Sequence, residues 1–139
     1  MPNKYHPFDG RLEHRALASA ALTATTVLAT ITQRAAMRTD YLTKVIIEAI
    51  DIVSSDELYT LVVELSDDNF ATVNEVAAIC DFGDTAVRQS GAPDTVAADE
   101  VEIPWNTERN GVVYQYARLK LFAAGTTPSI TLGVHSTVC

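Results

Sequence analysis

Apolar and polar residues alternate with a period of two along most of the chain after residue 44, and this pattern predicts short β-strands. The alternation is clearest over residues 112–123 and 129–138, which are separated by the turn signal Gly-Thr-Thr-Pro at 125–128. These two runs predict a hairpin with one apolar face and one polar face. Residues 57–65 show the same period and predict another strand with a single apolar face.

Other segments add to this picture of a sheet protein. Residues 45–53 are apolar on both faces, which is typical of a central strand. Residues 101–105 contain Pro104, which lacks a backbone donor and restricts the run to an edge or a strand end. Asn110-Gly111 is a strong signal for a tight turn. Short strands separated by turns predict an all-β sandwich or barrel.

The leading segment is different in composition. Residues 12–21 are rich in helix formers, whereas residues 23–32 are dense in β-branched side chains that favour strands. We expect an extended arm over residues 1–21 that enters a strand near residues 22–31, with one sandwich domain over 22–139. An amphipathic helix over residues 12–37 is the alternative.

Length and charge narrow the possible functions. A chain of 139 residues is long enough for one domain with a real core. Through residue 44 there are six basic and three acidic residues, net +3, and the remainder holds four basic and fifteen acidic, net −11, which together give −8. An acidic body argues against binding to nucleic acid or an anionic membrane. Residues 16–31 are too short and too often interrupted by Ser and Thr for a spanning helix, and no signal peptide is expected.

Motifs that carry chemistry are scarce. Asp81-Phe82-Gly83 matches the metal-binding tripeptide of kinases, but the rest of that signature set is missing. The acidic residues of 94–102 lack the regular ligand spacing of a calcium loop and are expected to lie in water. Cys80 and Cys139 fit neither a disulfide framework nor a zinc site. We therefore predict a protein that is not an enzyme and that has no cofactor or metal.

Two surfaces are candidates for binding another protein. Aromatic and basic side chains in the arm could anchor it on a neighbouring subunit, and a face of the strand at residues 112–123 combines tyrosines with cations, which are enriched at interfaces. Cross-strand pairing with His135 or Thr137 would extend that face. An ordinary packed sheet face and a loose terminus are the alternatives. The predicted contact residues are Lys4, Tyr5, Phe8, Arg11, Arg15, Tyr114, Tyr116, Arg118 and Lys120.

Several of these segments resemble a known family. The resemblance lies in Asn110-Gly111, the Tyr114–Leu119 segment Y-Q-Y-A-R-L, and the motif G-T-T-P-S-I-T at residues 125–131. Upstream, S-D-E-L-Y at 55–59 and L-S-D-D-N-F-A at 65–71 are also similar. The chain thus resembles the capsid-stabilising cement (decoration) proteins of short-tailed double-stranded-DNA phages from about residue 51 onward. Residues before 42 match that pattern poorly.

The resemblance implies a jelly-roll β-sandwich on the outer surface of an icosahedral virion. Such a protein is made in the host cytoplasm, bridges major capsid protein subunits, often as a homodimer, and resists the pressure of packaged DNA. The competing interpretation is a jelly-roll carbohydrate-binding module that uses Trp105 and the tyrosines as stacking platforms.

Overall fold

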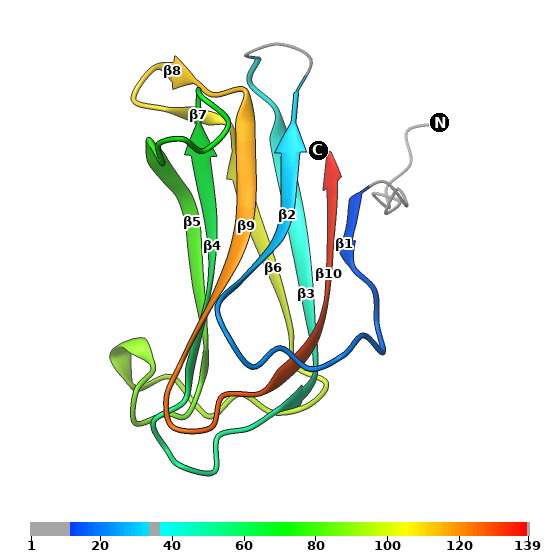
Figure 1. Ribbon diagram of the computed structural model, residues 1–139, viewed down its shortest axis with the longest axis vertical. Coiled ribbons are helices and arrows are strands. Elements are labelled where there is room, and N and C mark those ends of the chain that lie inside the picture. Colours follow the sequence, from blue (N-terminus) through cyan, green and yellow to red (C-terminus); the bar gives the residue numbers. More distant parts are fainter. Residues whose placement is uncertain (1–11, 34–36, 139) are drawn as a thin grey trace.

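A computed structural model describes residues 12–33 and 37–138, which form two antiparallel four-stranded sheets packed face to face (Figure 1). One sheet has the order β1 (Glu13–Arg15), β10 (Ile130–Val138), β3 (Asp40–Ile50) and β6 (Glu100–Asn106). The other has the order β2 (Thr26–Thr32), β9 (Tyr116–Ala124), β4 (Leu58–Ser66) and β5 (Glu75–Gly83). A small hairpin pairs β7 (Glu108–Arg109) with β8 (Val112–Val113), and a 3₁₀ turn, η2 (Gln89–Gly91), lies between β5 and β6.

The connectivity is that of a jelly roll. Strand β1 pairs with β10, β2 with β9, β3 with β6 and β4 with β5, so a long double-stranded ribbon is wound into two sheets. The prediction of an all-β, jelly-roll-like sandwich is confirmed.

The core lies between the sheets and follows the two-residue period. Four alternate side chains of β4 point inward and are at most 1% exposed, as predicted from residues 57–65. Strand β3 lies between β10 and β6, so the expectation of a central strand there is also confirmed. Pro104 lies in the edge strand β6, where the missing donor breaks no ladder. The fully buried aliphatic side chains of the other strands are Val45, Ile47, Leu119, Leu121, Ile130, Leu132 and Val134.

The predicted hairpin of the last two runs is wrong. Strand β9 pairs with β2 and β4, whereas β10 pairs with β1 and β3 in the opposite sheet. Two strands that face one core from opposite layers show the same alternation as two strands of a hairpin. The alternation therefore indicates which side chains face the core and leaves open which sheet each strand joins.

The leading segment enters the sandwich earlier than predicted. Strand β2 covers most of the expected strand region, and the alternative helix is wrong over its described residues. Glu13–Arg15, which the sequence assigned to the arm, forms β1 and pairs with His135 and Val134. This pairing covers an edge of β10 that would otherwise expose backbone donors and acceptors. Residues 1–11 of the predicted arm lie outside the described residues.

A cluster of hydrogen bonds holds the point at which the chain crosses from β9 to β10. Thr126 donates to Asp56 from both its backbone N–H (3.1 Å) and its hydroxyl (2.6 Å). The Thr127 hydroxyl donates to the fully buried carboxylate of Glu57 (3.1 Å). The Tyr59 hydroxyl accepts from the Ser129 N–H (2.8 Å) and donates to the Asp51 carbonyl (2.7 Å). These bonds join two segments that are about 70 residues apart in the chain.

The acidic members of this cluster are held in the ionised form. The Thr126 bonds lower the pKa of Asp56 below its usual value. Burial acts to raise the pKa of Glu57, but the backbone N–H and hydroxyl donors around its carboxylate outweigh burial and lower it. The charges are therefore part of the fold at neutral pH.

Gly125 is required at this crossing. Its φ is +116°, and an added Cβ would lie 2.7 Å from the Glu57 Cα and 2.9 Å from the Asp56 carbonyl oxygen. Gly111 in the β7–β8 turn also has a positive φ, +77°, but a Cβ there would meet nothing within 4 Å.

We predict that Gly125→Ala lowers the free energy of unfolding by about 3 kcal/mol, since it adds overpacking to backbone strain. Gly111→Ala, the matched control, is expected to cost about 1 kcal/mol, because only strain is added there. Urea unfolding followed by circular dichroism measures both. Equal losses for the two variants would contradict the role given to the crossing.

Candidate functional site

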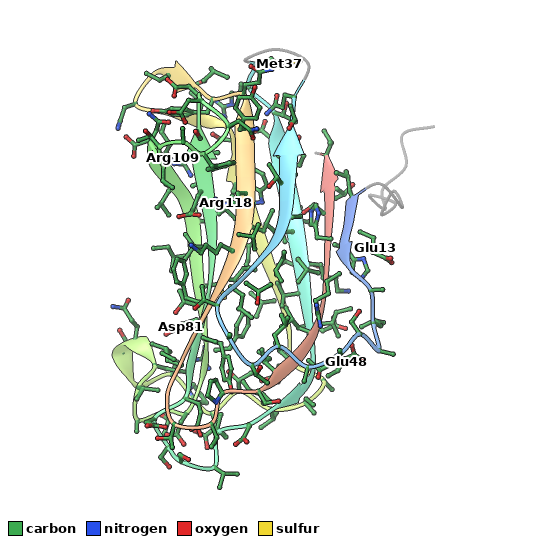
Figure 2. All side chains as sticks on the ribbon, viewed as in Figure 1. Glu13, Met37, Glu48, Asp81, Arg109 and Arg118 are labelled. Atoms are coloured by element: carbon green, nitrogen blue, oxygen red, sulfur yellow. The ribbon has the colours of Figure 1, made fainter. Side chains whose placement is uncertain are left out.

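The outer face of the β2-β9-β4-β5 sheet carries most of the described part of the predicted contact patch. Tyr116, Arg118, Lys120 and Phe122 alternate along β9 on this face, opposite the buried row of the same strand. Figure 2 shows Arg118 about midway along β9, in the front sheet of that view. Strand β9 is an interior strand, so its neighbours β2 and β4 complete the surface.

Tyr114 does not belong to this face, which corrects the prediction. Its side chain is 7% exposed and is part of the hydrophobic core. The run predicted as one strand is divided into β8 and β9, and Tyr114 lies between them. Its N–H donates to the Thr107 carbonyl (2.9 Å) and takes no part in the pairing of β9. The break shifts the period, so an alternation counted through it assigns Tyr114 to the wrong side. His135 and Thr137 cannot extend the face either, because β10 lies in the other sheet.

Arg118 is engaged within the chain. Its Nε and Nη2 lie 2.9 and 2.8 Å from Glu64 Oε1, and its guanidinium carbon lies 4.4 Å from the centre of the Phe70 ring. Both side chains of the ion pair are largely buried. Arg118 thus neutralises the one carboxylate that β4 places on this face, and it fixes the sheet surface around it.

Lys120 lies at the centre of an apolar row that crosses all four strands. Its direct cross-strand neighbours are Val27 on β2 and Val62 on β4, and Val62 in turn pairs with Ile79 on β5. Its ammonium lies 4.8 Å from the centre of the Phe122 ring. Across residues 12–33 and 37–138, no carboxylate forms an ion pair with Lys120.

The surface formed by these side chains is unusually apolar for an exposed sheet. Val27 is 45% exposed and Ile79 is 66% exposed, and Val76 and Phe122 are also exposed. We call this surface the apolar strip, and it consists of the exposed Val27, Val76, Ile79 and Phe122 together with Lys120 and Val62, which lies beneath its neighbours and is only 8% exposed. Contiguous exposed apolar surface of this kind is a mark of an interaction site.

The outer face of the other sheet has a different character. Lys44 pairs with Glu100 (3.2 Å) there. The Ala18 N–H donates to the Glu48 carboxylate (2.9 Å), and the Leu17 side chain packs so closely over Gly133 that a Cβ there would lie 2.7 Å from it. This face is thus charged and partly covered by the segment that leads from β1 to β2, with Glu48 marked beside it in Figure 2.

A shallow cavity adjoins the apolar strip at the β5 edge. It has a volume of about 510 Å³, and the charged residue of its lining, Asp81, is already engaged by Arg88 (3.6 Å) and by the Gln89 N–H (2.9 Å). Burial raises the pKa of the Cys80 thiol, which is therefore protonated at neutral pH and is not an activated nucleophile. The lining residues are Leu58, Thr60, Ile79, Cys80, Asp81, Val87 and Gln89.

A second group of polar residues lies inside the sandwich. The Trp105 indole N–H donates to Thr43 Oγ1 (2.8 Å), which lies 2.8 Å from Ser136 Oγ, which in turn lies 2.7 Å from His14 Nε2. Trp can only donate, so Thr43 Oγ1 accepts the Trp105 bond, whereas the Thr43 and Ser136 hydroxyls can each donate or accept and the role of His14 Nε2 follows from its tautomer. The four residues come from β6, β3, β10 and β1, so the bonds link every strand of that sheet.

The contact between Ser136 and His14 is a structural one, because Ser136 is fully buried between the sheets and a substrate could not reach its hydroxyl. Trp105 is 4% exposed and stacks on Tyr41, with ring centres 4.5 Å apart. It is a core residue and cannot serve as a stacking platform. Within the described ranges, no group of three or more His, Cys, Asp or Glu side chains is arranged to hold a metal ion. None of the described segments forms a helix long and apolar enough to cross a bilayer.

The remaining predicted contact residues are divided between two places. Arg15 lies on β1, where it is half-buried and donates to the Ala20 carbonyl. Lys4, Tyr5, Phe8 and Arg11 lie outside the described residues. The sequence reasoning missed Val27 and Ile79, although each is an apolar residue on the outward side of a strand.

Comparisons with known proteins identify no family for this chain. No protein-family model matches the chain, and no curated protein matches it. A solved structure of the CBM22-1 and GH10 modules of endo-1,4-β-D-xylanase 10B from Clostridium thermocellum, complexed with xylohexaose, is similar with a TM-score of 0.42 and 17% identity. The similarity covers 86% of this chain and 26% of the xylanase chain. At this TM-score it supports no inference about function.

We predict a pH dependence of stability that comes from His14. Burial, with a further contribution from the charge of His135, lowers the His14 pKa from 6.5 to about 4. Between these pH values His14 is protonated in the unfolded chain but stays neutral in the folded protein. The free energy of unfolding therefore falls as the pH decreases from 6.5 to about 4. His14→Gln keeps an acceptor but does not titrate, and its stability should decline less steeply in this window. Urea unfolding at several pH values measures the difference, and parallel curves for the two proteins would refute the prediction.

Proposed function

We propose that this protein is a structural virion protein that binds the outer surface of an icosahedral phage capsid. There it would cement neighbouring major capsid protein subunits and stabilise the shell against internal DNA pressure. The proposal rests on the resemblance to phage cement proteins and on the apolar strip. Its partners would be the major capsid protein and further copies of itself, and its site of action the capsid exterior.

The residues that carry the resemblance support a shared fold. The S-D-E-L-Y segment at 55–59 and the G-T-T-P-S-I-T motif at 125–131 are in direct contact through Asp56, Tyr59, Thr126 and Ser129. Two motifs that meet in space form one structural unit, so their joint occurrence is more informative than either alone. These motifs support a shared sandwich fold only. Binding to a capsid has to be argued from the residues on the surface of the sandwich.

The apolar strip is the observation that carries the proposal. In a chain of net charge −8, the outer face of the β2-β9-β4-β5 sheet has Glu64 neutralised by Arg118 and Asp81 by Arg88. Lys120 remains as a cation among apolar side chains. Such a face fits a protein surface that is itself apolar and bears a carboxylate near its centre.

A cement protein stabilises a shell through the total contact area of its many copies more than through high affinity at a single site. Strands spaced by about 4.8 Å, with about 3.3 Å per residue, give this four-stranded face an area of roughly 600 Å². A standard stable interface buries about 800 Å² on each partner, so a single copy provides slightly less. Repetition around a closed shell makes such contacts multivalent, and the shell then resists local opening.

The carbohydrate-binding alternative has little support from the aromatic residues. Trp105, Tyr41, Tyr59 and Tyr114 are all buried in the core, and Tyr116 is half-buried. A sugar platform needs a flat ring open to solvent. Phe122, at 38% exposure, is covered on one side by Lys120.

The test is reconstitution on shells that lack the protein. Purified protein is mixed with such shells, which are then pelleted and heated. We expect the protein to sediment with the shells and to raise their disruption temperature. Sedimentation of the shells alone, with unchanged heat resistance, would refute the proposal.

The binding face can be tested with matched variants. Ile79→Ser removes the most exposed side chain of the apolar strip, and we expect it to weaken shell binding by about tenfold, the scale of one buried aliphatic contact. Val53→Ser makes a similar change in an exposed loop away from the sheet face and should bind as the wild type does. Equal binding of all three proteins in a sedimentation titration would place the contact elsewhere.

A further inference from the structure

Strand β1 is held to the sandwich by few backbone bonds. It has three residues, and its register with β10 shifts between Glu13 and Arg15, so that His14 lies at an irregular point of the ladder. On its other side no described strand pairs with it (Figure 1). Arg15 Nε is buried and has no hydrogen-bond partner among the described residues, which makes the paired state of β1 more costly. Short edge elements of this kind open more readily than the rest of a fold.

The His14 side chain provides the polar attachment of β1 to the interior. Its Nε2 lies 2.7 Å from Ser136 Oγ, which lies 2.8 Å from Thr43 Oγ1. Because the Trp105 indole only donates, Thr43 can pass its own proton to Ser136, and Ser136 can donate to a neutral His14. A protonated imidazole has no acceptor atom, so this arrangement of the bonds is lost when His14 takes up a proton.

The charged groups around His14 do not compensate a proton there. Strand β10 contributes His135, which is itself a base, and β3 contributes Lys44, the cross-strand neighbour of His135. Strand β2 and the segment before it contain no ionisable side chain. On β1, Arg15 is a cation, and the Glu13 carboxylate lies 3.8 Å from His135. Across the described ranges His14 forms no ion pair with a carboxylate, so a charge on it would be half-buried and uncompensated.

The segment that follows β1 has attachments of its own. The Ala18 N–H donates to both oxygens of the Glu48 carboxylate (2.9 and 3.0 Å). Leu22 and Ile130 exchange two backbone hydrogen bonds (2.7 and 3.0 Å). These bonds do not involve β1, so β1 can leave β10 while the chain from Ala18 onward stays in place.

We propose that β1 is an acid-operated latch, which leaves β10 when His14 takes up a proton while the rest of the sandwich stays folded. The latch has two states, one paired with a neutral His14 and one released with a protonated, solvated His14. Release turns β10, a strand of nine residues, into the edge of its sheet, where its backbone groups are free to pair with another strand. The release needs no shell and no partner, so it is independent of the function proposed above.

The size of the effect follows from the titration of His14. Burial, with a further contribution from the charge of His135, lowers the His14 pKa from 6.5 to about 4. Release restores the ordinary pKa, so the ratio of released to paired molecules rises as the pH falls from 6.5 to about 4. Between pH 7.5 and pH 4.5 this ratio rises about 70-fold. A released population of about 1% at pH 7.5 thus becomes about 40% at pH 4.5.

The experiment is amide hydrogen exchange of the full chain at pH 7.5 and pH 4.5, with each rate divided by the intrinsic rate at that pH. Protection of the β1 amides should fall by about 70-fold. It should also be insensitive to low concentrations of urea, because a local opening exposes little surface. The amides of Leu22 and of β4 open only with the whole fold. They should be more protected than those of β1 at both pH values and should respond to urea.

Two variants separate His14 from the other titrating groups. His14→Gln keeps an acceptor but cannot titrate, so its β1 amides should lose the pH dependence. His135→Gln is the matched control, because it removes the other histidine and leaves His14 to titrate, and most of the 70-fold fall should remain. In the wild type, the single indole N–H, that of Trp105, should also exchange faster at pH 4.5, because the bonds that lead to it from His14 loosen.

Three results would overturn the latch. The first is a wild type whose β1 amides keep their protection at pH 4.5. The second is an equal fall in His14→Gln, and the third is a β1 opening that depends on urea as strongly as the unfolding of β4 does. Should His14→Gln fail to fold, the first and third results still decide on the wild type alone.

Discussion

The structure depends on how the chain is held where it crosses from one sheet to the other between β9 and β10. Tyr59 comes from the middle of the buried β4 row, and its hydroxyl bonds to the backbone of the crossing segment at Ser129. Asp56 and Glu57 hold the two threonines that precede it. Within this cluster Glu57 and Tyr59 are buried, and they stabilise the fold only because their polar atoms are matched by hydrogen-bond partners. The cluster fixes β9 in one layer and β10 in the other.

The surface follows from this arrangement. Because β9 lies between β2 and β4, the cross-strand neighbours of Lys120 are Val27 and Val62. Val62 in turn pairs with Ile79 on β5. The opposite sheet is linked internally by the bonds from Trp105 to His14, and its outer face is charged and partly covered. The two faces of the sandwich are therefore unequal, and the face that remains apolar is suited to contact a large, repeated protein surface.

Much of the fold could be predicted from the sequence, because alternation reports local geometry. The inward row of β4, the edge position of Pro104 and the Asn110-Gly111 turn all depend on neighbouring residues. The sheet to which each strand belongs depends on distant contacts, and the pairing of β9 with β10 was wrong for that reason. The His14–Ser136 bond joins residues 122 positions apart and has no local signal.

The candidate site was harder to predict than the fold. The outward-facing residues of β9 from Tyr116 onward were predicted correctly. Tyr114 was not, because a break between β8 and β9 shifts the alternation there by one residue. The row on β5 was missed because the register with β4 shifts between Val63 and Glu64, which obscures the alternation near Ala78. An exposed valine or isoleucine is also uninformative until its neighbours in space are known.

An electron-microscopy reconstruction of purified virions that contain this protein tests most directly whether it is a capsid cement. We expect an ordered layer of sandwiches outside the shell, with the β2-β9-β4-β5 face and Lys120 against the coat subunits. Particles without such a layer would contradict the claim that the protein is a capsid cement. Sandwiches that meet the coat through the β1-β10-β3-β6 face would contradict the role given to the apolar strip.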